Sequence, residues 1–166
     1  PVTILAGNKV EAADLVYAQN RPVCHIQQTV AQTGWTTSTF NAITFSATDI
    51  LDPYEMHDPA TNNTRVVIGT ILGWWRVSGV FNPATNTANT MMRAAIAKNG
   101  TRLKSGFVGV SPASSGGIMG VATGTVYVEA TVATDYIELQ GYVTAASGTI
   151  GSGVSGDVAC SISAEW

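Results

Sequence analysis

From Val23 onward, apolar and polar residues alternate along most of the chain. A period of two is typical of β-strands, because successive side chains point to opposite faces of a sheet. We therefore expect one face of each strand to be buried and the other to face outward. The alternation predicts an inward set of Cys24, Ile26, Val30, Trp75, Val77, Gly79, Phe81, Met92, Ala94, Ile96, Val126, Val128, Ala130, Val132, Ile137, Leu139, Val143, Val158, Cys160 and Ile162.

Turn-forming residues separate these runs. Asn99-Gly100 is the strongest hairpin signal, because a type I′ turn needs positive φ at both central positions, and residues 98–103 are predicted to form a tight turn. Gly, Ser, Asn and Pro mark further loops at residues 82–83, 111–117 and 146–156. The spacing predicts about eight to ten strands in an all-β, two-sheet sandwich with Greek-key links.

Residues 1–22 differ from the rest of the chain. The segment Glu11–Gln19 is the one credible short helix, and Arg21-Pro22 would end it. We expect this segment to be an N-terminal arm that anchors the domain of residues 23–166 to another protein. Its candidate anchoring side chains are Val10, Leu15 and Tyr17.

The chain has 166 residues, which suits one domain, and only 11% of them are charged. Ala, Thr, Val and Gly make up nearly half of the chain, which favours strands over helices. A surface with so few charges is expected to be partly covered by another copy of the chain or by another protein.

Composition also argues against several partners. The net charge is −3 and the sequence contains no basic run, so nucleic acid is not expected as a partner. No stretch of about 18 apolar residues or signal-peptide pattern is present, so we expect neither membrane insertion nor a signal peptide.

The sequence lacks the common catalytic motifs. Residues 151–156 spell G-x-G-x-x-G, but an alternating strand follows them instead of the helix that a dinucleotide site needs. The motifs G-x-S-x-G, H-E-x-x-H and C-x-x-C are also missing. We therefore expect a protein that is not an enzyme and that needs no cofactor.

One segment is rich in acidic residues and contains His57. Carboxylates gathered in a loop can bind calcium, and the alternative is that they cap turns around Pro53 and Pro59. We favour turn capping and commit to no metal site. The acidic residues concerned are Asp49, Asp52, Glu55 and Asp58.

Cys24 and Cys160 both fall in the inward phase of their strands. If the first and last strands pair, a disulfide between them is geometrically feasible, whereas two buried free thiols are the interpretation that we favour. His25 lies in the outward phase and is expected to be an ordinary polar partner.

Exposed aromatic residues suit either sugar stacking or a protein interface. Trp74 and Trp75 are adjacent, so they point to opposite faces of one strand. We expect Trp75 in the core and Trp74 at a subunit interface rather than at a glycan site. The full set of candidate interface residues is Trp74, Tyr127, Tyr136 and Tyr142.

From Val23 to its end the chain resembles the complement component 1q-like and tumour necrosis factor-like jelly rolls, most closely those of bacteriophage virion proteins. Several short blocks in a fixed order carry this resemblance: residues 28–45, Met56-His57-Asp58, Thr64-Arg65, 73–79, 93–101 and 135–140. The resemblance implies a homotrimer packed around a three-fold axis.

The resemblance and the arm together lead to two expected functions. The first is a trimeric structural protein on the surface of a phage particle, as capsid decoration, head fibre or tail knob, assembled in the bacterial cytoplasm and joined to other virion proteins by its arm. The alternative is a tail receptor-binding module that recognises a host glycan or surface protein through loops at residues 49–63, 82–90 and 111–117.

Overall fold

The computed structural model describes residues 21–46, 51–84, 89–110, 120–145, 152–155 and 158–166. Within these ranges the regular structure is β-strand and two 3-10 turns, and no helix is long and apolar enough to cross a membrane. The strands are β1 (Val23–Gln27), β2 (Phe40–Ala42), β3 (Val66–Val67), β4 (Gly73–Phe81), β5 (Asn89–Lys98), β6 (Thr101–Arg102), β7 (Val108–Val110), β8 (Val121–Ala122), β9 (Val126–Ala130), β10 (Tyr136–Ala145), β11 (Val154–Ser155), β12 (Val158–Ala159) and β13 (Ser161–Glu165), and the 3-10 turns are η1 (Ile68–Thr70) and η2 (Lys104–Gly106).

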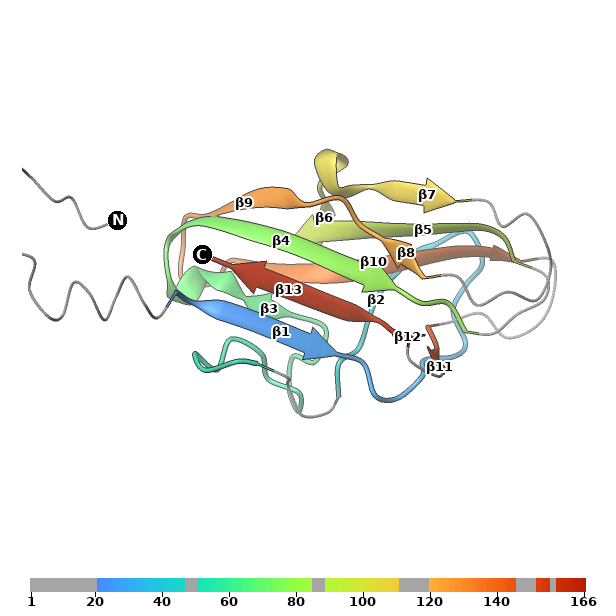
Figure 1. Ribbon diagram of the computed structural model, residues 1–166, viewed down its shortest axis with the longest axis horizontal. Coiled ribbons are helices and arrows are strands. Elements are labelled where there is room, and N and C mark those ends of the chain that lie inside the picture. The colour runs from blue at the N-terminus through green and yellow to red at the C-terminus, as the bar shows by residue number, and fades with distance from the viewer. Residues whose placement is uncertain (1–20, 47–50, 85–88, 111–119, 146–151, 156–157) are drawn as a thin grey trace, which may run out of the picture.

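Two antiparallel sheets pack face to face. The first has the order β1-β13-β4, and both β8 and β9 pair with the far edge of β4. The second has the order β2-β10-β5-β6, with β3 added to β10 and β7 added to β5. Figure 1 shows β1, β13 and β4 side by side in front and β5 and β10 in the layer behind. This is the predicted all-β jelly roll, and its first and last strands are neighbours.

The core lies between the sheets and follows the predicted alternation. On β4, Trp75, Val77 and Phe81 are fully buried, whereas Trp74 is exposed. Burying a large apolar side chain contributes about 1.5–3 kcal/mol, so this one strand supplies a large share of the packing free energy. Trp75 keeps its polar group satisfied, because its indole N–H donates to the Ile71 carbonyl at 3.0 Å.

The alternation was wrong at two strand ends. Val30 is 61% exposed because β1 ends at Gln27, and Val132 is 53% exposed because β9 ends at Ala130. In both cases the chain leaves the sheet while the apolar pattern continues. The predicted helix Glu11–Gln19 and the arm residues Val10, Leu15 and Tyr17 lie outside the described residues.

The predicted hairpin at Asn99-Gly100 is confirmed. Asn99 has φ 50° and Gly100 has φ 77°, and Lys98 lies opposite Thr101 in the β5–β6 pairing. Positive φ at both central residues is the geometry of a type I′ turn, which matches the twist of the flanking strands.

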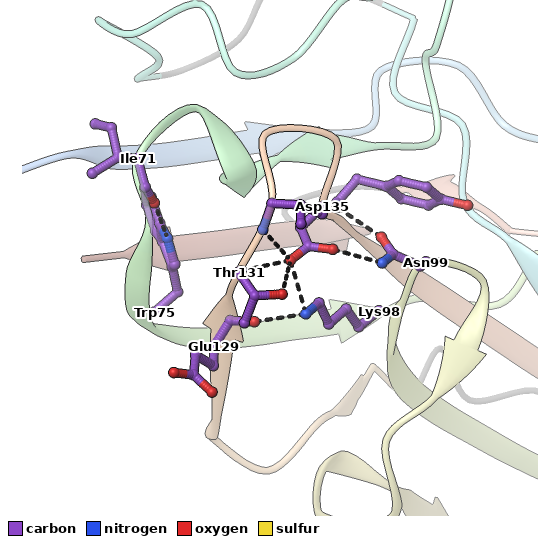
Figure 2. A network of polar contacts seen from close by, with 9 residues as sticks. Ile71, Trp75, Lys98, Asn99, Glu129, Thr131 and Asp135 are labelled. Carbon is purple, nitrogen blue, oxygen red and sulfur yellow. Dashed lines mark hydrogen bonds and ion pairs between the residues drawn. The ribbon is translucent and has the colours of Figure 1, made fainter.

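A buried carboxylate ties this hairpin to the turn between β9 and β10 (Figure 2). Asp135 is 2% exposed, and one of its oxygens accepts bonds from the Thr131 amide at 2.7 Å and the Val132 amide at 3.2 Å. The ammonium of Lys98 lies 2.9 Å from the same oxygen, and the Asn99 side-chain amide donates to the other oxygen at 2.7 Å. These donors hold the pKa of Asp135 well below its usual range, the Thr131 amide contributing most.

The same turn also positions η1. The amide of Gly69 donates to the backbone carbonyl of Asp135 at 2.8 Å. A Cβ on Gly69 would lie 2.2 Å from the Val132 carbonyl oxygen, so only glycine allows this approach. Asp135 and its neighbours therefore join three segments that are distant in sequence.

We expect Asp135→Asn to lower the melting temperature by several degrees at pH 7, because it removes the charge that five donor groups stabilise. The native pKa is depressed, so the stabilisation is fully present above the unfolded-state pKa of about 3.9 and is lost as pH falls through the lower native value. The difference between wild type and variant should therefore shrink below about pH 4. Thermal unfolding from pH 7 to pH 2 measures this.

The matched control is Glu129→Gln, which removes an exposed carboxylate from the adjacent strand. A constant difference between Asp135→Asn and wild type across the whole pH range would contradict the assigned role of the charge.

Candidate functional site

The outer face of the first sheet carries two exposed aromatic residues on neighbouring strands. Trp74 on β4 is 60% exposed and Tyr127 on β9 is 69% exposed. Trp74 lies opposite Glu129 and Arg76 lies opposite Tyr127, so the two rings are diagonal neighbours on one surface. We call the surface formed by Trp74, Arg76, Tyr127 and Glu129 the β4–β9 face.

The rest of this outer face is formed by small polar side chains. Ser78 on β4 lies opposite Ser163 on β13, and Ser163 lies opposite His25 on β1. The His25 ring nitrogen Nδ1 and the Ser163 hydroxyl are 2.5 Å apart, which fits the ordinary polar role expected for His25. Arg76 and Glu165 form an exposed ion pair at 3.6 Å. Beyond the charged residues Arg76, Glu129 and Glu165, the described neighbours on this sheet are thus uncharged side chains.

A hollow of about 390 Å³ adjoins Trp74 at the start of β4. Its remaining walls are Arg21, Leu72, Gly73 and Trp166. The Trp166 indole N–H donates to the Leu72 carbonyl at 3.1 Å, which holds the C-terminal residue against the start of β4. The hollow extends the β4–β9 face with apolar surface, since Leu72 is 55% exposed.

The other two predicted interface residues lie on the opposite side of the sandwich. Tyr136 and Tyr142 are on β10 of the second sheet and are only partly exposed. The Arg65 guanidinium lies 4.2 Å from the centre of the Tyr136 ring, and the Arg93 guanidinium lies 4.9 Å from that of Tyr142. The structure therefore brings Trp74 and Tyr127 together and separates them from Tyr136 and Tyr142.

Around Tyr142 the outer face of the second sheet combines arginines with aromatic rings. Phe40 packs against Tyr142 with ring centres 5.0 Å apart and against Phe107 at 5.8 Å. Arg93 lies 5.4 Å from the Phe107 ring centre and Arg102 lies 4.3 Å from that of Phe40. We call the surface of these five residues the arginine–aromatic face.

This face borders a second hollow, of about 440 Å³. Thr101, Arg102, Leu103, Lys104 and Phe107 line it, and Phe107 is 43% exposed. The sequence pattern contained no signal for this site, because its residues come from β2, β5, β6, β10 and the residue after η2.

Hydrogen bonds and a neighbouring charge lower the pKa of Tyr142 within this face. The Thr144 hydroxyl donates to the Tyr142 phenol oxygen at 3.2 Å. Bonds from Thr144 and Ser38, together with the charge of Arg93, hold the pKa of Tyr142 below its usual value although burial acts in the opposite direction.

In the acidic segment two of the four predicted carboxylates cap turns. The Asp52 carboxylate accepts the amides of Met56 at 3.0 Å and His57 at 2.8 Å. The Asp58 carboxylate accepts those of Ala60 and Thr61 at 2.9 and 3.1 Å, and these bonds lower its pKa.

This local capping is the interpretation that we favoured over calcium binding. Glu55 occupies a turn position with φ 51°, and Asp49 lies outside the described residues. Among the described residues no three His, Cys, Asp or Glu side chains gather as metal ligands.

The described parts of the predicted receptor loops do not all share one end of the sandwich. Residues 82–84 follow β4 at the end where β5 begins, whereas residues 51–63 start beside β1 (Figure 1). The amide of His25 donates to the Leu51 carbonyl at 2.7 Å, so that segment extends the edge of the first sheet. Residues 111–117 lie outside the described residues.

Cys24 and Cys160 are both buried and free. In the β1–β13 pairing Cys24 lies opposite Ala164, four positions from Cys160, which separates the two cysteines by about 13 Å at about 3.3 Å per residue. A disulfide needs Cα atoms within about 7 Å, so the free thiols that we favoured are confirmed. Burial raises the pKa of Cys160 to about 12.

Comparisons with known proteins identify the fold. No protein-family model and no curated protein sequence matches the chain. Among solved structures it is similar to murine APRIL, crystallised at pH 5.0, with a TM-score of 0.59 and 8% identity over 89% of this chain and 100% of that chain. At this identity the likeness shows the fold alone, and that fold is a tumour necrosis factor-like jelly roll.

We expect native protein to react negligibly with Ellman's reagent at pH 8, because both thiols are buried and Cys160 is held in its neutral form. After unfolding without a reductant, two thiols per chain should react. Thr101→Cys, which places a thiol at an exposed position, is the positive control for accessibility. Unfolded protein that releases no thiol would contradict the free-cysteine assignment.

Proposed function

We propose that this protein is a non-enzymatic structural protein that assembles as a homotrimer and is displayed on the surface of a bacteriophage virion. The observation that carries the self-association is the β4–β9 face, where Trp74 and Tyr127 are mostly exposed on adjacent strands. An exposed aromatic pair on a weakly charged sheet favours contact with another protein surface.

The energetic gain from covering this face is substantial. Each aromatic side chain would lose about 100 Å² of exposed surface. At about 25 cal/mol per Å² this contributes about 2.5 kcal/mol for each ring in each subunit. The short side chains of Ser78 and Ser163 allow a neighbouring backbone to approach closely, and the hollow beside Trp74 offers space for a protruding side chain.

The number of subunits and the virion location rest on the sequence resemblance to the trimeric jelly rolls of phage particles. In a three-fold ring each subunit uses two different surfaces, so the β4–β9 face would contact another part of the neighbouring copy. Tyr136 and Tyr142 need no such cover, because Arg65 and Arg93 already stack on their rings. Residues 1–22 would join the trimer to other virion proteins.

A second candidate function is recognition of the host cell surface. The arginine–aromatic face supports it, because a hollow bordered by cations and an exposed Phe107 ring suits a polar ligand. This face lies on the opposite side of the sandwich from the β4–β9 face, so one trimer has room for both roles.

The double variant Trp74→Ala/Tyr127→Ala tests the interface. We expect wild type to have a mass of about 52 kDa by light scattering, three times the 17.3 kDa of the chain, and the variant to be a monomer with unchanged strand content by circular dichroism. The control is Phe107→Ala, which removes an exposed ring from the opposite side of the sandwich. A variant that stays trimeric would exclude this face, and monomeric wild type would exclude the trimer.

Immunogold electron microscopy tests the virion location. Antibodies raised against the purified protein should label phage particles released from cells that carry its gene, with pre-immune serum as the control. Label along the head would support decoration, whereas label at the tail tip would favour the receptor-binding role. Unlabelled particles from cells that contain the protein would overturn the virion assignment.

A further inference from the structure

We propose that the arginine–aromatic face and its adjoining hollow form a binding site for an acidic polysaccharide, a chain of sugar rings that carry carboxylate or phosphate groups. This inference assigns a site and a ligand class to host-surface recognition, and in that sense it rests on the second candidate function. It does not depend on the trimer.

Cations without a described carboxylate partner gather on this face. Among the described basic residues, Arg65, Arg76 and Lys98 each lie within 4 Å of a carboxylate. No described carboxylate pairs with the cations Arg93, Arg102 and Lys104, which lie on β5, β6 and η2. In the sequence, residues 85–88 come directly before β5 and residues 111–119 directly after β7. Neither segment contains Asp or Glu. Within the part of the chain that the structure describes, one surface thus carries three cations with no carboxylate partner, although the net charge of the chain is −3.

Aromatic rings hold the two arginines in place without using their hydrogen-bond donors. Arg93 lies over the rings of Tyr142 and Phe107, and Arg102 lies over that of Phe40. Stacking restrains the guanidinium plane and leaves its N–H edge able to form paired bonds with a carboxylate or phosphate. Because the side chains are already restrained, binding costs less conformational entropy.

The hollow beside these cations has the size and lining of a sugar-binding site. Its volume of about 440 Å³ falls within the range of small-ligand sites, about 300–1,000 Å³. Phe107 and Leu103 offer apolar surface to the C–H face of a sugar ring, while Thr101 and Lys104 offer polar groups to its hydroxyls. A sugar that carries an acidic group matches this combination.

The spread of the cations favours a polymer over a small anion. In the β5–β6 pairing Arg102 lies opposite Ala97, so its backbone lies about 13 Å along the strand from that of Arg93. The two guanidinium groups lean onto neighbouring rings, Phe107 and Phe40, while Lys104 lies on η2 beside the hollow. A chain with charges at intervals can contact all three cations at once, whereas a single small anion contacts fewer of them.

The test measures binding of full-length protein by isothermal titration calorimetry at low and high salt. The probes are a polygalacturonate oligomer for carboxylate, a phosphomannan oligomer for phosphate, neutral dextran, inorganic phosphate and an oligothymidylate. We expect at least one acidic polymer to bind, with an affinity that falls as salt rises, while dextran shows no binding. Which polymer binds distinguishes a carboxylate ligand from a phosphate ligand.

Variants locate the site. Arg102→Gln and Lys104→Gln should each weaken binding, by about tenfold for the arginine, because a charge-assisted bond is lost. Lys104 is exposed and makes no cation–π contact with a described ring, so its variant tests the charge with little loss of packing. Arg76→Gln on the opposite face is the matched control and should leave the affinity unchanged.

Several outcomes would overturn the proposal. The first is that neither acidic polymer binds at low salt. The second is that dextran or inorganic phosphate binds as tightly as the acidic polymers, or that the oligothymidylate binds more tightly than they do. The third is that Arg76→Gln weakens binding as much as Arg102→Gln does. Trp74→Ala/Tyr127→Ala should keep its polysaccharide affinity, so failure of the trimer and failure of this site are observed separately.

Discussion

The buried carboxylate of Asp135 determines how the second sheet is arranged. It holds Lys98 and Asn99 of the β5–β6 hairpin against the turn that precedes β10, while the Asn99 side-chain oxygen accepts the Tyr136 amide at 3.0 Å. These bonds fix the register in which Ile137 lies opposite Lys98. A slip of one residue would exchange the inner and outer faces of a strand, so this turn decides which side chains of β10 meet those of β5.

The arginine–aromatic face follows from that register. Five residues further along the same pairing, Tyr142 lies opposite Arg93, and the cation reaches the ring because both side chains point outward. The first sheet obtains its outer face in a similar way, since β4 places Trp75 inside and Trp74 outside. The two outer faces therefore differ in chemistry: one has exposed aromatics among short polar side chains, and the other has cations stacked on rings.

The sequence pattern correctly predicted the features that depend on residues close together in the chain. Alternation placed Trp75 and both cysteines in the core, Asn99-Gly100 formed its turn, and Asp52 and Asp58 capped amides within five residues of themselves. The pattern was wrong at Val30 and Val132, because hydrophobicity does not mark where a chain leaves a sheet. It could not place Tyr136 and Tyr142 on the side opposite Trp74, since alternation separates inward from outward but does not say which sheet a strand joins.

The contacts of the arginine–aromatic face were beyond sequence reasoning for the same reason. Phe40 and Arg102 are 62 positions apart and meet only once β2 and β6 have joined opposite edges of one sheet. Long-range attraction is weak here, because the net charge is −3 and salt screens charges beyond about 8–10 Å. An acidic ligand would therefore be held by direct contact with Arg93, Arg102 and Lys104. That distinguishes this surface from nucleic-acid-binding proteins, whose overall positive charge attracts the phosphate backbone from a distance.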